Sequence, residues 1–360
     1  ARDGIGRIYM LYDKSGRHFT RFDTEGKIDF GFESAIMGVL PSTIEIKAMT
    51  VDPKTNRIFV VDGDKQVHAV TETGHNTFTR SDSVDLATLP DIETNDILTA
   101  VAAYNGELFL TVQRNRSPSL AKPNKLFACT AALSGTTLTL TEKNAAELDE
   151  LRTSAVMNVP TQCTGLFADA SGVYCLLKEQ ELHHGKLYAL GQLVCYTYSG
   201  STFTDKTKLG LNPAASTRDP IAFNAQYFSN PVGFIGYDED NIYIADDGVN
   251  IEYLNENWRI NGNKNRIATF NRGNGSLSFS DSGATWFTEH AVYKKPNTKI
   301  LLWEKRSPAM TLSPMNYWTS ETGTDTRPSN LLFEDSTSPT IEPTDVFCYD
   351  QDGNLYILWK

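Results

Sequence analysis

The sequence predicts an all-β fold built from four-stranded antiparallel sheets that repeat along the chain. One repeated pattern is a pair of short strands around a turn that contains Gly, found at 7–22, 125–139 and 186–204 and more loosely at 66–79 and 266–278. The other pattern alternates apolar and polar residues on both sides of a turn rich in Asp, Asn and Gly, and it begins near residues 46, 99, 164, 233 and 345. Alternation with a period of two around such a turn is typical of a β-hairpin. Each unit is therefore predicted to be two successive hairpins, which make strands a, b, c and d of one sheet.

Sheets repeated in this way predict a closed β-propeller, because a four-stranded meander cannot bury both faces alone and radial stacking covers them. Small residues such as Ala48, Gly165 and Gly233 fall on the predicted innermost strands, where chains crowd near the axis. The spacing of the units leaves one gap of double length, so six blades are predicted, with five or seven as alternatives. The whole chain, 1–360, is then a single domain.

The two ends of the chain are expected to form one blade together. The last unit, 344–359, supplies only strands a and b, whereas the chain begins with strands c and d at 7–22. The N-terminal strands would then complete the last blade by pairing with 354–359, which removes open sheet edges. Helix is expected only at 145–152, where good helix formers allow one or two surface turns.

Composition excludes some classes of partner. The formal net charge is −11 and no basic stripe is visible, which argues against nucleic-acid binding. No apolar run approaches the ~20 residues that span a bilayer. The sequence begins at Ala1 without an initiator Met, so a leader was removed or the sequence was trimmed. We expect an extracytoplasmic bacterial monomer, in the periplasm, at the cell surface or secreted.

The five cysteines are Cys129, Cys163, Cys175, Cys195 and Cys348. Their number is odd, they form no CxxC pair, and each lies among apolar strand residues, where a free thiol behaves as a small hydrophobe. Buried free thiols are therefore predicted; one disulfide is the first alternative and a metal site the second.

Two stretches carry a resemblance to known propellers. The a–b frame with a Tyr in strand b, at 231–246 and 343–356, resembles NHL-repeat six-bladed propellers. Residues 280–286, with Asp281, Gly283 and Trp286, look like the Asp-box turn of sialidase-type and sortilin-type propellers, although Phe279 stands where that motif begins with Ser. The resemblance implies a propeller fold, and the Asp-box is a structural turn in those families, so no activity follows from it.

Several motifs have both a functional and a structural interpretation. Residues 350–354 and 246–250 are rich in Asp and Asn and could hold Ca²⁺, but the first occupies an a–b turn where Asp and Gly serve turn geometry. No cofactor is expected otherwise. His183 and His184 could be ligands or bases, although adjacent His residues in a polar segment are commonly solvated. The basic pair Arg114 and Arg116 could seat a carboxylate or belong to a solvated loop.

The lengths of the loops indicate which face carries function. The a–b and c–d turns are short, whereas the b–c connections at 113–124, 178–186 and 247–265 and the d–a connections at 81–95, 142–161 and 208–231 are long. Binding residues concentrate on loops carried by a rigid scaffold, and aromatics with Arg favour binding hot spots. The predicted ligand-binding residues are Arg114, Arg116, His183, His184, Tyr227, Asp247, Tyr253, Trp258 and Arg259.

The sequence thus predicts a non-catalytic propeller that binds a protein or a saccharide through its long-loop face. The alternative is a propeller hydrolase or lyase with a metal near the central axis. No catalytic residue is assigned, because neither a nucleophile elbow nor the sialidase arginine triad can be placed.

Overall fold

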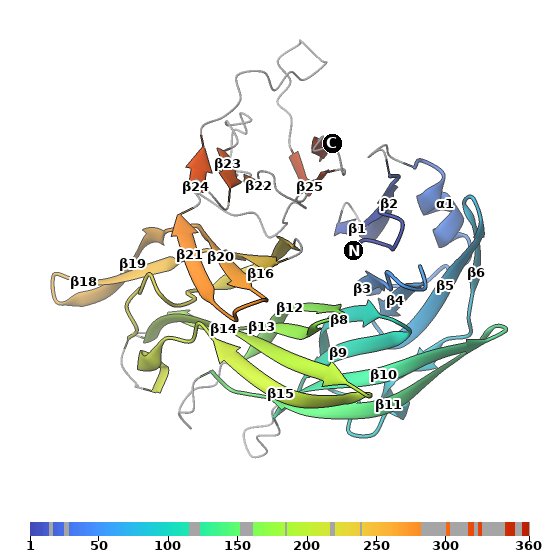
Figure 1. Cartoon of the computed structure of the whole chain (residues 1–360), viewed down its shortest axis with the longest axis horizontal. Coiled ribbons are helices and arrows are strands. Elements are labelled where there is room, and N and C mark those ends of the chain that lie inside the picture. Colours follow the sequence, from blue (N-terminus) through green and yellow to red (C-terminus); the bar gives the residue numbers. More distant parts are fainter. Residues whose placement is uncertain are drawn as a thin grey trace, which may run out of the picture. The chain divides into compact units, whose positions relative to one another are not determined.

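The computed structural model describes residues 1–13, 17–24, 29–114, 123–151, 161–183, 186–216, 220–237 and 240–281, and strand segments at 300–302, 316–319, 323–325, 343–349 and 355–359. In these residues the fold is all-β, and the described helical segments are short (Figure 1). The predicted fold class is therefore confirmed. None of the described helices has the length and apolar character that crossing a bilayer requires.

The strands form four-stranded antiparallel sheets in which neighbours in the sequence are neighbours in the sheet. The first is β3 (Ile46–Val51), β4 (Ile58–Asp62), β5 (Gln66–Gly74) and β6 (Thr77–Arg80), with β7 (Val84–Asp85) added beside β5. The second is β8 (Ile97–Tyr104), β9 (Glu107–Gln113), β10 (Asn124–Ser134) and β11 (Thr137–Leu148). The third is β12 (Gln162–Asp169), β13 (Gly172–His183), β14 (Lys186–Ser199) and β15 (Thr202–Leu209). The fourth is β16 (Pro231–Tyr237), β17 (Asn241–Asp246), β20 (Arg266–Asn271) and β21 (Leu277–Asp281).

These sheets have the strand order predicted for propeller blades, and strands β3, β8, β12, β16 and β25 (Pro343–Tyr349) begin within a few residues of the predicted positions. The terminal segments form the hairpins β1 (Ile8–Asp13)–β2 (Arg17–Phe22) and β25–β26 (Leu355–Trp359), and β22 (Ile300–Leu302), β23 (Asn316–Thr319) and β24 (Gly323–Asp325) form a three-stranded sheet. The pairing of the two terminal hairpins in one blade, and the number of blades, stay predictions.

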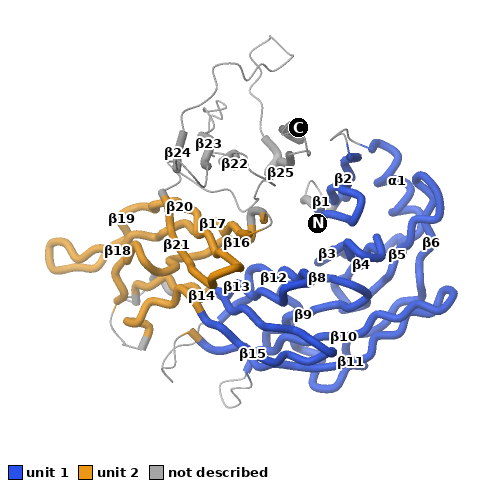
Figure 2. Tube along the Cα trace, viewed as in Figure 1, with its two compact units in different colours: residues 1–150, 160–177, 193–208 blue, residues 151–159, 178–192, 209–360 orange. Residues whose placement is uncertain are grey.

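The chain divides into two compact units, each of which is considered by itself (Figure 2). Unit 1 comprises Ala1–Glu150, Pro160–Leu177 and Leu193–Lys208, and unit 2 comprises Leu151–Val159, Lys178–Gln192 and Leu209–Lys360. Strands β13 and β14 contribute to both units. That the chain forms one propeller domain stays a prediction.

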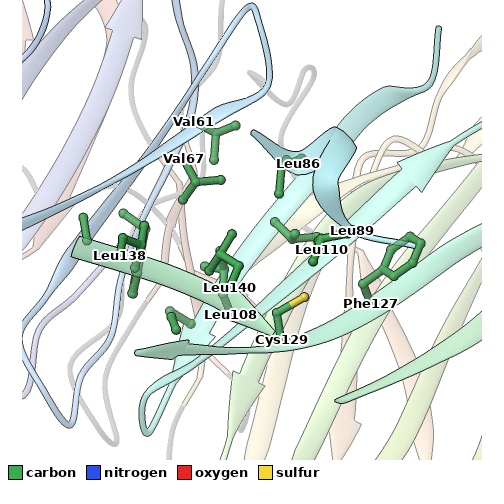
Figure 3. Close-up of a cluster of buried hydrophobic side chains, with 14 of the residues drawn as sticks. Val61, Val67, Leu86, Leu89, Leu108, Leu110, Phe127, Cys129, Leu138 and Leu140 are labelled. Carbon is green, nitrogen blue, oxygen red and sulfur yellow. The ribbon is translucent and has the colours of Figure 1, made fainter. Parts of the chain in front are cut away.

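The core of unit 1 lies between sheets. Apolar side chains of β4 and β5, including Val61 and Val67, share one buried cluster with Leu108, Leu110 and Leu140 of the second sheet (Figure 3). The first sheet also shares a cluster with the β1–β2 hairpin, through Tyr9 and Phe19. The two faces of the first sheet thus obtain the apolar cover that a lone meander lacks.

The turn after β3 is tied to the turn after β8 by one carboxylate. Asp52 is fully buried and accepts hydrogen bonds from the backbone N–H of Asn105 at 2.9 Å and of Gly106 at 2.6 Å. It also accepts from Lys54 N–H at 2.9 Å and from Thr55 Oγ1 at 2.8 Å within its own turn. These four donors satisfy the hydrogen-bonding capacity of a side chain that is removed from water. The Asp in the a–b turn therefore joins neighbouring sheets as well as shaping its own turn.

The helix expected at 145–152 is wrong, because residues up to Leu148 continue strand β11. Ala145 pairs with Phe127 and Leu148 with Asn124 across β10, so tertiary pairing overrides the helical propensity of this run. A helix that the sequence analysis missed, α1 (Phe32–Met37), buries Phe32 and Ile36, one turn apart, in the cluster with Tyr9.

Candidate functional site: the β18–β19 hairpin and its base

The b–c connection of the fourth sheet is a β-hairpin. Strand β18 (Val249–Leu254) pairs with β19 (Asn257–Asn263), with Leu254 opposite Asn257 and Tyr253 opposite Trp258. The two residues of the turn, Asn255 and Glu256, have φ of 50° and 61°, which is the geometry of a type I′ turn. The hairpin extends outward from the β16–β17–β20–β21 sheet (Figure 1). The long loop predicted at 247–265 is thus regular structure, because its apolar and polar residues alternate.

Cross-strand pairing places the apolar side chains of the hairpin on one face. Ile251 lies opposite Ile260 and Tyr253 opposite Trp258, and directly opposed residues share a face. Near the base, Val249 and Ile251 are buried against Leu187 and Ala189 of β14, and Trp258 packs against this cluster. On the same face, Ile260, opposite Ile251, is 44% exposed, and Tyr253, nearer the tip, is 59% exposed. We call Ile251, Tyr253, Trp258 and Ile260 the apolar face of the hairpin.

The opposite face is polar and satisfied within the hairpin. Arg259 donates to Glu252 Oε1 through Nε at 2.9 Å and through Nη2 at 2.7 Å. Asn261 Nδ2 donates to the other carboxylate oxygen of Glu252 at 2.6 Å. Arg259 therefore lies on the face away from Trp258 and has a carboxylate partner of its own, and the expected pocket that combines Trp258 with Arg259 stays a prediction.

A buried ion pair holds the base of the hairpin. Asp246 ends β17 and Arg266 begins β20, and Arg266 Nη2 lies 2.8 Å from Asp246 Oδ2, with side chains 4% and 0% exposed. The guanidinium of Arg266 lies over the rings of Phe223 and Phe279, at 4.7 Å and 4.3 Å from their centroids. Burial raises the pKa of Asp246, and the charge of Arg266 opposes that shift.

The same guanidinium holds the preceding connection in place. It donates to the backbone carbonyl of Ala225 at 2.8 Å and to that of Tyr227. Tyr227, one of the predicted binding residues, is thus fixed through its main chain beside the base of the hairpin, and its side chain is partly exposed. Asp247, the next predicted residue, accepts a hydrogen bond from Asn230 Nδ2 at 2.6 Å.

The remaining predicted residues lie elsewhere or outside the described residues. Arg114 is 5% exposed and forms a buried ion pair with Asp96, which is 3% exposed, so it is a structural cation of unit 1 and the solvated-loop interpretation is wrong. His183 is the last residue of β13, since the loop predicted at 178–186 consists largely of β13 and β14. Arg116 and His184 lie outside the described residues, as do residues 350–354 and most of the Asp-box-like stretch.

The structure therefore brings Tyr253 and Trp258 together, with ring centroids 5.4 Å apart, and places Tyr227 and Asp247 near the base of the same hairpin. Sequence reasoning missed Ile260 and Leu254, which are 44% and 41% exposed. The period-two alternation from Val249 to Tyr253, followed by the Asn255–Glu256 turn, was the signal that could have identified the hairpin. Convergence of the predicted loops over one axial opening stays a prediction.

Four of the cysteines, Cys129, Cys163, Cys175 and Cys195, are free, as predicted. Cys129, Cys163 and Cys175 are buried and Cys195 is partly buried. Burial raises the pKa of the Cys129 and Cys195 thiols to about 12. Within the described residues, no group of three or more His, Cys, Asp or Glu side chains is placed to hold a metal ion.

Fold and site together define an all-β protein of repeated four-stranded sheets that carries a projecting hairpin with one apolar face. Residues 140–295 match a family model described as the TdpA C-terminal domain. A curated relative, the 53 kDa membrane antigen A of Treponema denticola, is 26% identical over 306 residues, which cover 82% of this chain and 59% of the relative. The chain thus spans about three fifths of the length of that relative.

Solved structures give weaker likenesses. The periplasmic gluconolactonase of Pseudomonas aeruginosa is 11% identical, with a TM-score of 0.36 over 98% of this chain and 94% of that chain. The α-L-arabinanase of Cellvibrio cellulosa is 11% identical, with a TM-score of 0.37 over 78% of this chain and 93% of that chain. Likenesses at these TM-scores carry no argument about function.

Proposed function

We propose that the chain is an extracytoplasmic, non-catalytic binding protein and that the apolar face of the β18–β19 hairpin is its binding surface for a protein partner. The observation that carries this proposal is the solvent exposure of Tyr253 and Ile260 on a face whose base is buried. An exposed apolar surface on a regular, projecting element is a common feature of binding sites. That the Treponema denticola relative is a membrane antigen supports a location outside the cytoplasm.

A saccharide is the second candidate, and one observation favours it. Tyr253 and Trp258 form a tilted ring pair with centroids 5.4 Å apart, and aromatic rings offer a flat apolar surface with polar handles. The exposed aliphatic side chain of Ile260 favours a protein, because it adds apolar area without a hydrogen-bonding group. The catalytic alternative, a hydrolase or lyase with an axial metal, has no comparable support among the described residues.

The experiment compares the two faces of the hairpin. Tyr253→Ser changes the apolar face, while Asn257→Ser changes an exposed position on the polar face. Wild type and both variants are immobilised and presented, separately, with envelope proteins extracted from the source organism and with a glycan array. A ligand retained by wild type and Asn257→Ser but lost by Tyr253→Ser supports the proposal, and its chemical class decides between protein and saccharide.

Two outcomes would contradict the proposal. One is a ligand held equally by Tyr253→Ser and wild type, and the other is the absence of any retained ligand from either source. Thermal unfolding of each variant accompanies the assay, so that loss of binding is separated from loss of fold. Tyr253 is preferred to Trp258 for this test because Trp258 packs on the buried cluster at the base.

A further inference from the structure

The chain contains three Asn–Gly dipeptides, Asn105–Gly106, Asn261–Gly262 and Asn274–Gly275, and the structure describes all of them. In such a pair the backbone nitrogen of the glycine can attack the amide carbon of the asparagine side chain, because glycine has no side chain that hinders the approach. The reaction releases ammonia and converts the asparagine to an acid. A glycine N–H that is held in a hydrogen bond must first be released from its acceptor, which slows the attack.

The N–H of Gly106 is held by a buried carboxylate. It donates to Asp52 Oδ2 at 2.6 Å, and the N–H of Asn105 donates to Asp52 Oδ1 at 2.9 Å. Asp52 is fully buried, and hydrogen bonds to charged groups are stronger than those between neutral groups. The carboxylate also opposes loss of the Gly106 proton, because a second negative charge would then form beside it. This pair is therefore protected in the folded chain.

The N–H of Gly275 also has an acceptor. It donates to the backbone carbonyl of Asn271 at 2.9 Å, in the turn between β20 and β21. Asn274 is held in the same turn, since its N–H donates to Asn271 Oδ1 at 3.0 Å and its Oδ1 accepts from Ser276 N–H at 2.9 Å. These acceptors are neutral, so the pair is protected, but less strongly than the pair at Asn105.

A β-bulge lies at Asn261 and Gly262. Between the pairs Val249–Asn263 and Ile251–Ile260, one residue of β18 faces these two residues of β19. Such a bulge interrupts the ladder and leaves its extra residue unpaired. Gly262 has φ of 75°, a left-handed conformation that favours glycine. The interrupted ladder therefore holds the N–H of Gly262 less firmly than a carboxylate or a tight turn holds the other two.

The three pairs do not differ in their access to water. All three asparagines are exposed, and a Cβ atom on any of the three glycines would contact nothing within 4 Å. The Asn261 side chain donates from Nδ2 to Glu252 Oε2 at 2.6 Å. That bond engages the nitrogen that leaves in the reaction, and it lies on the polar face of the hairpin, where water competes for it. The hydrogen bonding of the glycine N–H is then the feature that distinguishes the pairs.

We propose that Asn261–Gly262 is the site at which the folded chain deamidates. The Gly262 nitrogen loses its proton to hydroxide and bonds to Cγ of Asn261. The Cγ–Nδ2 bond breaks, and Nδ2 takes a proton from water and leaves as ammonia. Water then opens the five-membered succinimide at either carbonyl, which gives aspartate or isoaspartate. The net reaction consumes water and releases ammonia, so it requires neither an oxidant nor a cofactor.

Both products change the hairpin beside its apolar face. Aspartate replaces the donor Nδ2 of Asn261 with a second carboxylate next to Glu252, and like charges across a strand pair are destabilising. Isoaspartate lengthens the main chain of β19 by a carbon atom, one residue after Ile260. The inference does not depend on the partner proposed for the apolar face, because the reaction needs only the folded chain and water.

Peptide mapping of aged protein tests this inference. The whole chain is incubated at mildly alkaline pH and digested with trypsin, which cuts after Arg259 and Lys264 and so isolates Asn261 in a short peptide. Fragment mass spectra measure the fraction of each asparagine that has become an acid. Asn261 should convert at least about tenfold faster than Asn105, whose glycine N–H must first leave a carboxylate, and Asn274 should convert at an intermediate rate.

The unfolded chain provides the control for sequence effects. In guanidinium chloride the three pairs should convert at rates within about threefold of one another, because their hydrogen bonds are lost. Asn261→Gln should abolish conversion at this position over the same period, since the longer side chain cannot close a five-membered ring, and should leave Asn105 and Asn274 unchanged. The inference is wrong if the three pairs convert equally fast in the folded chain, if Asn261 is not the fastest, or if the unfolded chain shows the same preference for Asn261.

Discussion

Arg266 Nη2 lies 2.8 Å from Asp246 Oδ2 across strands β20 and β17, and both side chains are almost fully buried. The ion pair links the end of β17 to the start of β20, which are the points where the chain enters and leaves the β18–β19 hairpin. The same guanidinium also holds the carbonyl of Ala225, so one cation joins the sheet to the preceding connection.

Removing either partner of this pair should destabilise the chain strongly. Arg266→Met leaves an unpaired buried carboxylate and Asp246→Asn leaves an unpaired buried guanidinium, and each is expected to cost about 3–5 kcal/mol of unfolding free energy. The double variant should cost less than the sum, because neither charge is then left alone. Urea unfolding of all four proteins measures this coupling.

The exposed ion pair Arg259–Glu252 on the β18–β19 hairpin provides the control for the Arg266 variants. Arg259→Met removes a cation that is 53% exposed and paired with Glu252, and it should cost under about 1 kcal/mol. If Arg266→Met were no more destabilising than Arg259→Met, the structural role given to Arg266 would be wrong.

His68 should make stability depend on pH near neutrality. It is 2% exposed on β5, and burial lowers its pKa below the ordinary 6.5, with the Asp62 carboxylate opposing this shift and Arg80 adding to it. The unfolded chain therefore binds a proton at a higher pH than the folded chain does. Stability is fully present above pH 6.5 and is lost as the pH falls toward and through the folded pKa.

The measurement is the unfolding free energy at pH 7.5, 6.5 and 5.5, for wild type and His68→Gln. Wild type should lose stability over this range, and His68→Gln should lose less. His75→Gln alters an exposed imidazole and should keep the wild-type slope. If the unfolding free energies of wild type and His68→Gln changed equally with pH, the role assigned to His68 would be wrong.

The buried thiols should be unreactive until the chain unfolds. The thiolate is the reactive form, and burial raises the pKa of Cys129 and Cys195 to about 12 and that of Cys175 well above its usual value. The hydrogen bond with Cys175 lowers the pKa of Cys163, but Cys163 is buried and therefore out of reach of a reagent. Thiol titration of a Cys348→Ala variant should detect almost no rapid reaction in the native state and four thiols in guanidinium chloride. Two missing thiols after unfolding would instead indicate a disulfide.

Pairing of the terminal hairpins in one blade can be tested by a double-mutant cycle. Leu11→Pro in β1 and Ile357→Pro in β26 each remove a backbone donor from a strand interior. If the two strands pair, the combined variant should cost less than the sum of the single changes, because either proline already disrupts the shared ladder. Strict additivity of the two unfolding free energies would argue against closure by these strands.

The sheet positions could be predicted from the sequence because the period-two pattern and the turn residues act locally. Ile46–Val51 and Pro231–Tyr237 begin where the repeated pattern places a first strand. Residues 145–148 could not be assigned in this way, since their strand depends on pairing with Asn124–Phe127, about twenty residues earlier in the chain.

In the candidate site, too, residue type could be read from the local sequence, whereas strand pairing could not. Tyr253 and Trp258 were identified by residue type, and their rings lie in contact. That Arg259 lies on the other face depends on strand register, which a loop interpretation of this segment ignores. The partners of Arg114 and Asn230 depend on burial at the strand ends, which neither spacing nor composition reveals.

The hydrogen bonds of Asp52 imply that the first sheet forms before the second sheet docks on it during synthesis. Its carboxylate is shared between its own turn and the backbone of Asn105 and Gly106, which are synthesised some fifty residues later. A nascent chain that ends before residue 105 has only the donors of its own turn, Lys54 N–H and Thr55 Oγ1, for this carboxylate, and water must take the places of the Asn105 and Gly106 N–H groups. The arrival of the second sheet then replaces water at Asp52 with two backbone donors, so the first sheet provides part of the surface on which the second sheet docks.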